Sequence, residues 1–348
     1  MRNKKWLTLS VISLLIICIL MSGCEKEPEK IAPREIKAEA SKVLLAGKKE
    51  VLEVPIKISP ADSYPLDFVI QTSDKEVANA TIGAIGNDGK VVTASDQQKK
   101  KQEADNKEDA DKIVVPTNTA VVTAEDFGEC DITISLGELS DSFNVVVADK
   151  QIALTFDDGA CPETFDLLKG LRKENVKATF FVVGSMTNAD NHIEALKEAI
   201  KDGHEIGNHT YNHKAGAATL KEELAKTDKI IEKAGGEKTT LMRPPGGSIN
   251  SATKKCGKSI VMWSVDTMDW KYKVPNEVRD RIFEAKDGDI VLLHDLHKTS
   301  VQGALKAIPK LKKKGFYMVT TTELLGDPKP NTEYRNKKTK IKSKILEK

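Results

Sequence analysis

A strand-like run that ends in two carboxylates, Ile152-Ala153-Leu154-Thr155-Phe156-Asp157-Asp158-Gly159, begins the longer of two patterned regions in this chain. Adjacent carboxylates directly after an apolar strand are costly unless chemistry needs them. Two histidines spaced i and i+4, His209 and His213, follow farther along the chain. They can face one point if the backbone between them is helical, and a nearby carboxylate would complete an Asp-His-His set suited to zinc. The two features together predict the site of a metal hydrolase.

Strand-like and helix-like segments alternate from Gln151 onward. Helical spacing of apolar residues appears, for example, at Phe165, Leu168 and Leu171. Such alternation favours an α/β fold in which parallel strands are joined by crossover helices. The predicted strands are 152–156, 178–183, 205–208, 241–243, 260–265, 289–294 and 316–320.

The conspicuous polar residues of this region come directly after predicted strands. They are Asp157, Asp158, His209, Arg243, Asp266 and His294. In a (β/α) barrel this is the face on which active sites form. An open doubly wound sheet would also gather strand ends at one edge, but no Gly-rich phosphate loop supports that alternative. We therefore predict an irregular (β/α) barrel of about seven strands over residues 150–326.

Residues 35–149 carry short runs of alternating apolar residues, such as Leu52, Val54 and Ile56, with turn signals between the runs. This pattern predicts an all-β sandwich ahead of the α/β domain. In Gln71-Thr72-Ser73-Asp74-Lys75-Glu76-Val77-Ala78 and Gly128-Glu129-Cys130-Asp131-Ile132-Thr133-Ile134, the region resembles the bacterial Ig-like domains of cell-surface proteins. Residues 95–112 are almost wholly polar, and we interpret them as an insertion at the surface.

Three basic residues near the N-terminus precede an apolar run from Trp6 to about Leu20, as in an export signal. The run ends in Met21-Ser22-Gly23-Cys24, which resembles a bacterial lipobox. The resemblance implies that residues 1–23 are a lipoprotein signal peptide, that Cys24 is lipidated and that residues 24–34 form a tether. An ordinary cleaved signal and an uncleaved anchor are the alternatives, and all three place the rest of the chain outside the cytoplasm.

The chain has 348 residues and a formal net charge of +2, so its bulk charge does not suggest a nucleic-acid partner. No obligate protein partner is inferred. If Cys24 is lipidated, Cys130, Cys161 and Cys256 remain, and this odd number leaves open whether one pair forms a disulfide. We interpret the lysine-rich residues 327–348 as a solvated basic tail, with contact to anionic wall polymers or lipid head groups as the alternative.

Five short motifs stand in order between Gln151 and Gly326. They are Thr155-Phe156-Asp157-Asp158-Gly159, His209-Thr210-Tyr211-Asn212-His213, Arg243-Pro244-Pro245-Gly246-Gly247, Asp266-Thr267-Met268-Asp269-Trp270 and Ile290-Val291-Leu292-Leu293-His294-Asp295. Together they resemble the polysaccharide deacetylase (NodB-homology) domain of the family 4 carbohydrate esterases. Any one motif alone would be weak, but five in register are specific. The last two motifs look most similar to those of peptidoglycan N-acetylglucosamine deacetylases.

This resemblance implies a metal centre, with the general acid and the general base on two different residues. Asp158, His209 and His213 would bind a divalent metal, most simply zinc, which polarises a carbonyl and lowers the pKa of water. Asp157 would be the general base that takes a proton from the attacking water, and His294 would be the general acid that protonates the departing amine.

The same resemblance implies a second set of residues around these groups. Arg243 would orient or neutralise Asp157, since a guanidinium can hold a carboxylate in fixed geometry. Asp266 would set the charge and orientation of His294. Outside the motifs, we interpret Trp263 as part of the barrel core.

Three positions would contact the substrate, on the same resemblance. Trp270 and Leu292 would line a small pocket for the acetyl methyl group, and the backbone N–H of Gly246 would help to stabilise the oxyanion. The chain departs from the family pattern in two places. Ala160-Cys161 stands where Pro is usual, and Gly246 stands where an aromatic residue is frequent. We hypothesise that Cys161, placed near the metal, makes activity sensitive to oxidation.

Three histidines lie outside the matched ligand and acid positions. We interpret His192 and His204 as structural, and His297 is a candidate for the rim of the substrate site. None of the three is needed for the metal set or for the acid-base pair that the motifs imply.

The sequence thus predicts a metal-dependent deacetylase that hydrolyses the acetamide of N-acetylglucosamine in peptidoglycan and releases acetate. We expect it to be lipid-anchored at the outer face of the bacterial cell membrane, with the β domain as a spacer or weak wall-binding module. Four alternatives stay open. They are a deacetylase of N-acetylmuramic acid, of another N-acetylated polysaccharide or of acetylated xylan, and a non-catalytic wall-binding protein.

Overall fold

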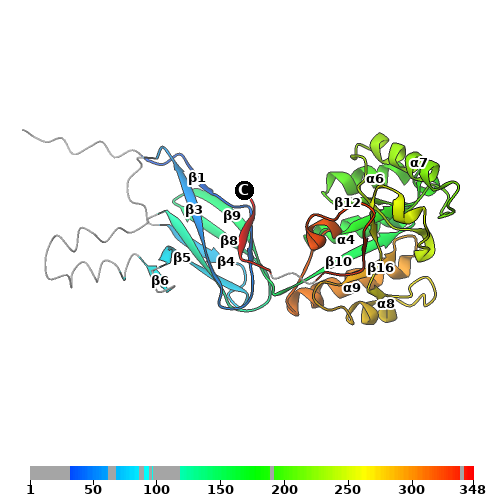
Figure 1. The fold of residues 1–348 in the computed structure, drawn as a ribbon. Helices are drawn as coiled ribbons and strands as arrows, with labels where there is room; N and C mark the ends of the chain where they lie inside the picture. Colours follow the sequence, from blue (N-terminus) through cyan, green and yellow to red (C-terminus); the bar gives the residue numbers. More distant parts are fainter. Residues whose placement is uncertain are drawn as a thin grey trace, which may run out of the picture.

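The computed structural model describes residues 32–61, 68–85, 90–93, 96, 118–188, 192–337 and 341–348. The predicted signal peptide, Cys24, most of the tether and all of the polar insertion except Asp96 lie outside these residues. In the described part of the chain, every helix is too short or too polar to span a bilayer. Two domains follow one another, an all-β domain and an α/β domain (Figure 1).

The first domain is built from two facing sheets. Its strands are β1 (Glu35–Ala38), β2 (Lys42–Leu45), β3 (Val51–Ser59), β4 (Val69–Thr72), β5 (Ala78–Ile85), β6 (Val91–Thr93), β7 (Thr119–Ala124), β8 (Gly128–Leu136) and β9 (Leu139–Val147), joined by β19 (Lys344–Glu347) from the far end of the chain. Among the described residues, one five-stranded sheet has the order β1-β3-β7-β5-β6 and the other β19-β2-β9-β8-β4. Ile56, Val122 and Ile134, from both sheets, share one hydrophobic core. The likeness to Ig-like domains stays a prediction.

A parallel sheet forms the second domain. Its strands are β10 (Lys150–Asp157), β11 (Thr179–Val182), β12 (Glu205–Asn208), β13 (Leu241–Met242), β14 (Ser259–Val261), β15 (Val265–Asp266), β16 (Ile290–His294), β17 (Phe316–Met318) and β18 (Glu333–Tyr334). Within the described ranges this sheet is nine-stranded, in the order β15-β16-β10-β11-β12-β13-β14-β18 with β17 beside β10. The predicted α/β fold is confirmed, as a curled half-barrel that stays open between β15 and β18.

The predicted number of about seven strands was too low. The apolar run 260–265, expected to be one strand, bends and gives the two strands β14 and β15, which lie in different parts of the sheet. In addition, β18 comes from the segment that was expected to be a solvated tail, and it pairs with β14.

Strand β10 is the central strand of the sheet and is buried on both faces. Ile152, Leu154 and Phe156 belong to the larger hydrophobic cluster, whereas Ala153 belongs to a second cluster. Because successive side chains of a strand point to opposite faces, the two clusters lie on opposite sides of the sheet. This double burial explains why the strand is apolar without alternation up to its polar end.

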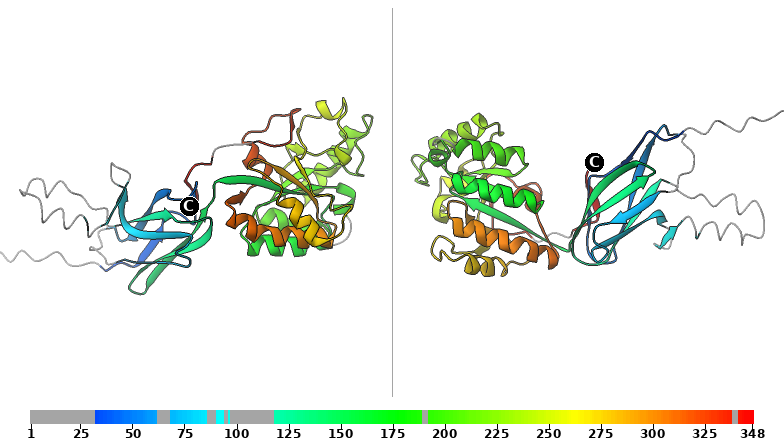
Figure 2. Two further views of the ribbon diagram at one scale, coloured as in Figure 1. Left: turned by 90° about the horizontal axis from the view of Figure 1, so that it is seen from below. Right: turned by 180° about the vertical axis from the view of Figure 1, so that it is seen from behind.

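Helices cover the outer face of the sheet (Figure 2). They are α4 (Pro162–Lys173), α5 (Gly184–Thr187), α6 (His192–Lys201), α7 (Leu220–Lys233), α8 (Pro275–Ile282) and α9 (Lys298–Lys313). The short helix α10 (Thr321–Leu325) packs on the opposite face, because Leu324 and Leu325 belong to the cluster of Ala153. Short 3-10 turns stand at η1 (Pro245–Gly247) and η2 (Thr253–Lys255). The apolar residues that predicted α4 do face the core, since Leu168 and Leu171 are fully buried. Pro162 is the first residue of that helix. Proline has no backbone N–H, and this costs little here because an N–H in the first turn has no partner within the helix.

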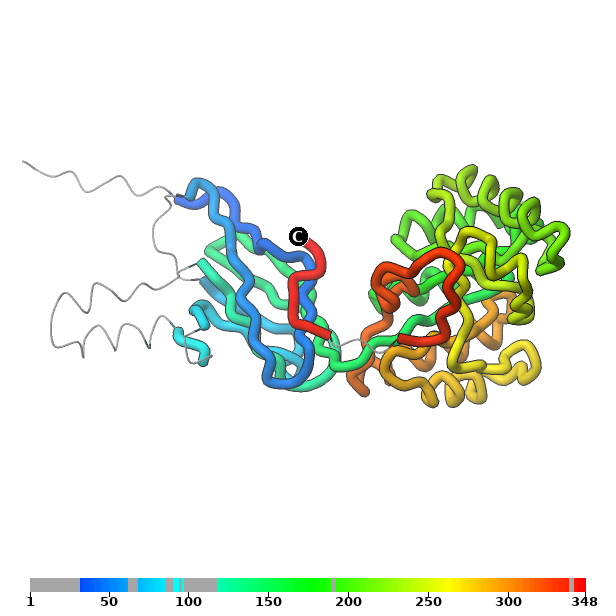
Figure 3. Tube along the Cα trace, in the orientation of Figure 1, coloured from blue at the N-terminus to red at the C-terminus, as the bar shows by residue number. Residues whose placement is uncertain are grey.

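The C-terminal segment is not a solvated tail in its described part. After β18 it leaves the second domain, and β19 pairs antiparallel with β2 of the first domain, so that the end of the chain lies against the first domain (Figure 3). Ile341 is only 8% exposed and packs with Leu44, Val146 and Tyr317. Within β19, Ile345 and Leu346 are both partly buried and pack in different clusters, so apolar residues on both faces of this edge strand are partly covered.

Direct contacts also join the two domains. The Nζ atom of Lys312 on α9 lies 2.5 Å from Oε2 of Glu129 on β8 and donates to the carbonyl of Glu174. Asn175 donates from Nδ2 to Oε1 of Glu129 at 2.7 Å. Lys312 and Glu129 are both mostly buried, so this ion pair is screened less by solvent than a surface pair would be.

We expect a chain that ends at Lys337 to be less stable than the full chain, because β2 loses one of its two neighbouring strands and the apolar surface around Leu44 becomes exposed. Burial of one isoleucine side chain alone corresponds to roughly 2 kcal/mol. Thermal unfolding followed by circular dichroism would measure the loss, with a chain that lacks only Lys348 as the control. Equal unfolding midpoints for the two chains would contradict a stabilising role of β19.

Candidate active site

A cavity of about 380 Å³ lies at the carboxyl ends of β10, β12, β15 and β16. It is lined by the predicted site residues Asp157, Asp158, His209, His213, Gly246, Asp266, Trp270, Leu292 and His294. The remaining predicted residue of the domain, Arg243, is fully buried beneath them. The strand ends thus bring together side chains that lie far apart in the sequence.

Trp263 and His297 also line this cavity. The interpretation of Trp263 as barrel core was incomplete: it packs against the cluster of Met242 and Ile260 but also faces the cavity, because β14 ends at Val261 and the chain bends before β15 begins. The bend turns the indole toward the site, where it also lies 5.7 Å from the guanidinium carbon of Arg243. His192 and His204 are absent from the described lining, in line with the structural roles expected for them.

Asp158, His209 and His213 form a compact set of possible metal ligands. One donor atom from each lies within 4.8 Å of the others. Oδ1 of Asp158 is 3.5 Å from Nε2 of His209 and 3.4 Å from Nε2 of His213. One carboxylate oxygen and two imidazole nitrogens around one point are ligands typical of zinc.

Two further observations test whether a metal fits this set. Oδ1 of Asp158 is buried and has no hydrogen-bond partner among the described residues, and such orphaned atoms are rare in folded proteins. The Nδ1 atom of His209 lies 2.7 Å from the carbonyl oxygen of Arg243. A carbonyl can only accept, so Nδ1 carries the proton and Nε2 presents a lone pair to the set. Both observations fit a cation at this point.

The loop between the two histidines is not helical, contrary to the condition under which their spacing was interpreted. Thr210 and His213 have φ angles of 68° and 56°, in the left-handed region that side chains disfavour. The two rings nevertheless lie close together, with centroids 5.0 Å apart. A tight turn, rather than one turn of helix, brings them to the same point.

Asp157 is held by a buried arginine, as the resemblance implies. Nη1 of Arg243 lies 2.7 Å from Oδ1 of Asp157 and also donates to the Thr155 hydroxyl at 2.8 Å. The other guanidinium nitrogens donate to the carbonyls of Val261 and Met262, both at 3.0 Å. Burial raises the pKa of Asp157, and the charge of Arg243 opposes that rise. A carboxylate with a raised pKa is better suited to take a proton near neutral pH.

His294 is oriented by Asp269 and not by Asp266. Oδ1 of Asp269 lies 2.8 Å from Nδ1 of His294, and Oδ2 accepts the backbone N–H of His294 at 2.7 Å. Asp266 instead accepts the N–H of Met268 at 2.8 Å and caps a turn. Met268 has a left-handed φ of 51°, and this turn carries Asp269 under the imidazole. The sequence alone could not tell which of two aspartates three residues apart would point that way.

The pKa of His294 rises to about 9. Burial by itself would lower it, but the hydrogen bond and the charge of Asp269 outweigh burial. His294 therefore holds a proton at neutral pH, with Nδ1 engaged by Asp269 and Nε2 left to face the cavity. That is the protonation state which a general acid requires.

Asp269→Asn should lower the pKa of His294, because the amide keeps the shape of the side chain but loses its negative charge. The basic limb of the pH–rate profile should then move to lower pH, and activity at pH 8 should fall by roughly tenfold or more. Asp266→Asn is the matched control and should leave that limb in place. Equal shifts in the two variants would contradict the assignment to Asp269.

Cys161 does not have the surroundings of a reactive thiol. It is 4% exposed, and burial together with the charge of Asp295 raises its pKa to about 12. It stands at the N-cap of α4, where it contacts Thr164 and the carbonyl of Asp295. Because the thiolate is the reactive form, the structure opposes the hypothesis that Cys161 confers sensitivity to oxidation.

We expect a Cys161→Ser variant to lose activity to peroxide at the same rate as the unaltered protein. Cys256, which is only partly buried, should react first with a thiol reagent such as dithionitrobenzoate. A time course of residual activity under peroxide would test this, with Cys256→Ser as the comparison variant. Slower loss in Cys161→Ser alone would revive the oxidation hypothesis.

Comparison with known proteins identifies the fold and its motifs. The family model described as polysaccharide deacetylase matches residues 144–262. A peptidoglycan-N-acetylglucosamine deacetylase of Bacillus cereus is 40% identical over 192 residues, which cover 51% of this chain and 89% of that protein. The chain belongs to the polysaccharide deacetylase family. The family resemblance expected from the five motifs is confirmed.

Other polysaccharide deacetylase relatives are longer than this chain. The peptidoglycan-N-acetylglucosamine deacetylase PgdA of Listeria monocytogenes is 39% identical over 185 residues, covering 51% of this chain and 39% of PgdA. The peptidoglycan-N-acetylmuramic acid deacetylase PdaC of Bacillus subtilis is 40% identical, covering 50% of this chain and 38% of PdaC. The chain thus matches less than half the length of these two relatives.

A solved structure supports the same architecture. The family 4 acetyl xylan esterase of Clostridium thermocellum, solved with a cobalt ion, is 30% identical, with a TM-score of 0.51. The match covers 54% of this chain and 98% of that esterase. The likeness therefore concerns the second domain of this polysaccharide deacetylase family member and leaves the first domain without a counterpart in that structure.

Proposed function

We propose that this protein is a metal-dependent deacetylase that hydrolyses the acetamide of N-acetylglucosamine in peptidoglycan and releases acetate. The observation that carries the proposal is one cavity in which a ligand set, a base and a protonated acid each have a separate buried support. The support is the Arg243 carbonyl for His209, the Arg243 guanidinium for Asp157, and Asp269 for His294.

Asp158, His209 and His213 would hold the metal, most simply zinc. When bound, it would polarise the carbonyl of the substrate and lower the pKa of water. Binding of cobalt to the related esterase supports a divalent cation in this family. The measurement below tests whether zinc restores activity.

Asp157 accepts the proton of the attacking water in this mechanism. Its carboxylate cannot turn away, because Oδ1 is fixed by Arg243 and the other oxygen, Oδ2, faces the ligand set at 3.7 Å from Nε2 of His209. His294 then delivers the proton that the amine nitrogen needs as it departs. Without that proton the tetrahedral intermediate would expel water instead of the amine.

Apolar residues complete the site for an acetyl group. Leu292 is buried, Trp270 is about half exposed, and both line the cavity. We assign them to the acetyl methyl group. The backbone N–H of Gly246, in the same lining, is assigned to the oxyanion, a contribution of about 3–4 kcal/mol where such donors have been removed from other enzymes.

The cellular setting is proposed from the N-terminal sequence and from the named substrates of the relatives. Lipidation of Cys24 would hold the enzyme at the outer face of the bacterial cell membrane, with the first domain as a spacer toward peptidoglycan. The likeness to PdaC keeps N-acetylmuramic acid as the main alternative sugar.

Acetate release from intact peptidoglycan, measured with and without chelator and after zinc is restored, tests the proposal. We expect chelator-sensitive release together with new free amines, which separate amide from ester hydrolysis. Asp157→Asn should lower kcat by roughly 10²–10⁴-fold, as expected for loss of a general base, while zinc still binds. Release of acetate from acetylated xylan alone would favour the esterase alternative, and no release from a zinc-loaded protein would favour a binding role.

A further inference from the structure

The loop that carries His209 and His213 rests against helix α7. Glu223, in the first turn of that helix, is only 7% exposed. Its Oε2 atom accepts the backbone N–H groups of Tyr211 at 3.0 Å and Asn212 at 2.6 Å. Its Oε1 atom accepts the side-chain amide of Asn212 at 3.0 Å. All three donors belong to residues that lie between the two histidines.

The loop needs such support because its backbone is unfavourable on its own. Thr210 and His213 adopt left-handed φ angles, and residues other than glycine persist there only when the surroundings impose it. A buried carboxylate that accepts two successive backbone N–H groups fixes the orientation of the peptides between the histidines. The direction of the His213 ring therefore depends on Glu223, although Glu223 does not line the cavity.

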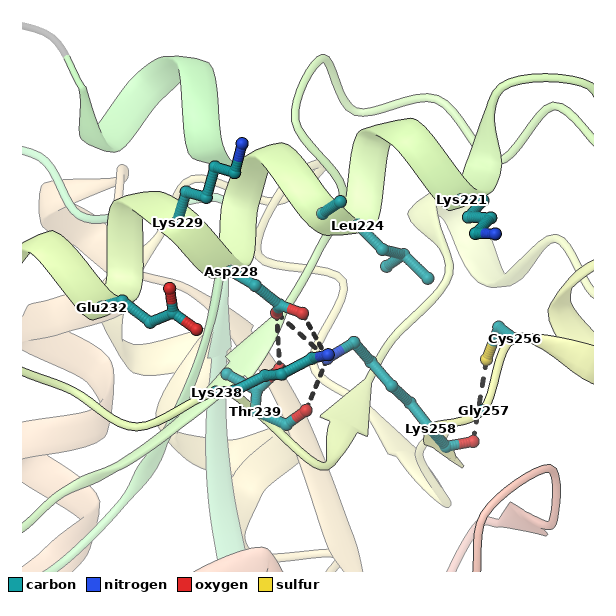
Figure 4. A pocket seen from close by; sticks show the side chains of 11 residues that line it. Lys221, Leu224, Asp228, Lys229, Glu232, Lys238, Thr239, Cys256, Gly257 and Lys258 are labelled. Atoms are coloured by element: carbon teal, nitrogen blue, oxygen red, sulfur yellow. Dashed lines mark hydrogen bonds and ion pairs between the residues drawn. The ribbon is translucent and has the colours of Figure 1, made fainter.

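Helix α7 holds the other end of the loop through Asn208. Oδ1 of Asn208 accepts the N–H of Thr210 at 2.9 Å, and Nδ2 donates to the carbonyl of Leu224 and to Oδ1 of Asp228. Asp228 is in turn paired with the buried Lys258 at 2.8 Å. Figure 4 shows Asp228 joined to Lys258 and Thr239 in the lining of a second cavity beside α7.

We infer that Glu223 is a positioning residue which sets the affinity of the Asp-His-His set for a divalent cation. It does so by holding the turn between the two histidine ligands in its left-handed form before the cation arrives. The inference rests on the proposed metal site and adds a residue outside the five motifs. Supports of this kind around metal ligands commonly change metal affinity by about 10–100-fold when they are removed.

Three substitutions of Glu223 separate the effect of its side-chain length from the effect of its charge. Glu223→Gln keeps the length of the side chain and an acceptor oxygen for the two backbone N–H groups. Glu223→Asp keeps the charge but withdraws the carboxylate by one methylene, and Glu223→Ala removes all three hydrogen bonds. Glu222→Ala is the matched control, since Glu222 is the neighbouring residue on the same helix and forms only an exposed pair with Lys226. Asp228 is a poorer choice because its removal would leave Lys258 charged and buried.

The dissociation constant for Zn²⁺, measured by competition with a chromophoric chelator, is the deciding quantity. We expect Glu223→Ala and Glu223→Asp to weaken Zn²⁺ binding by about 10–100-fold and Glu223→Gln by no more than about threefold. Glu222→Ala should bind as the unaltered protein does. Circular dichroism of the metal-free proteins shows which variants are folded. If the Glu223→Ala variant is unfolded, the Zn²⁺ affinities of the Asp and Gln variants test the inference.

The inference is overturned if folded Glu223→Asp binds Zn²⁺ as tightly as Glu222→Ala, since Glu223 would then serve the stability of α7 only. It is also overturned if Glu223→Gln binds as weakly as Glu223→Asp, because a side chain of the same length with an acceptor oxygen would then fail to hold the turn. These outcomes do not depend on acetate release. Normal Zn²⁺ affinities without deacetylation in the unaltered protein would instead contradict the proposed function.

Discussion

The buried guanidinium of Arg243 is the interaction on which the site depends. It joins three strands, because it pairs with Asp157 at the end of β10, follows β13 directly, and donates to carbonyls at and after the end of β14. The backbone carbonyl of the same residue fixes His209. Breaking a buried pair by removing one partner typically costs about 3–5 kcal/mol. The proposed base and one of the proposed metal ligands are thus supported by one residue that is fully buried.

This arrangement also explains how two adjacent aspartates come to face different partners. Asp157 ends β10 and points down to Arg243, whereas Asp158 has a left-handed φ of 75° and turns toward the histidines. Gly159 then passes against the carboxylate of Asp295, so closely that a Cβ atom would lie 2.2 Å from Oδ2. Only glycine fits there. The Asp-Asp-Gly order therefore follows from one side-chain contact and two successive backbone requirements as well as from chemistry.

Much of the second domain could be predicted from sequence because its signals are local. Apolar runs predicted the strands, and the polar residues that follow them predicted the edge of the sheet at which the site lies. Features that depend on contacts between distant residues were not visible. The turn of Asp266 decides that Asp269 reaches His294, the bend after Val261 carries Trp263 into the cavity, and burial rather than composition makes Cys161 unreactive. Glu223 belongs to this group, since nothing in an amphipathic helix marks one glutamate as facing a loop.

The C-terminal segment changes how the two domains are connected. A chain that passes once from one domain to the next leaves them free to swivel about that connection. Here the chain enters the second domain between β9 and β10 and returns as β19, so two crossings join the domains. The two crossings, together with the ion pair between Lys312 and Glu129, oppose such rotation. During synthesis β2 is made early and its partner β19 is made after the second domain, so the sheet of the first domain gains this strand only once the second domain has been synthesised.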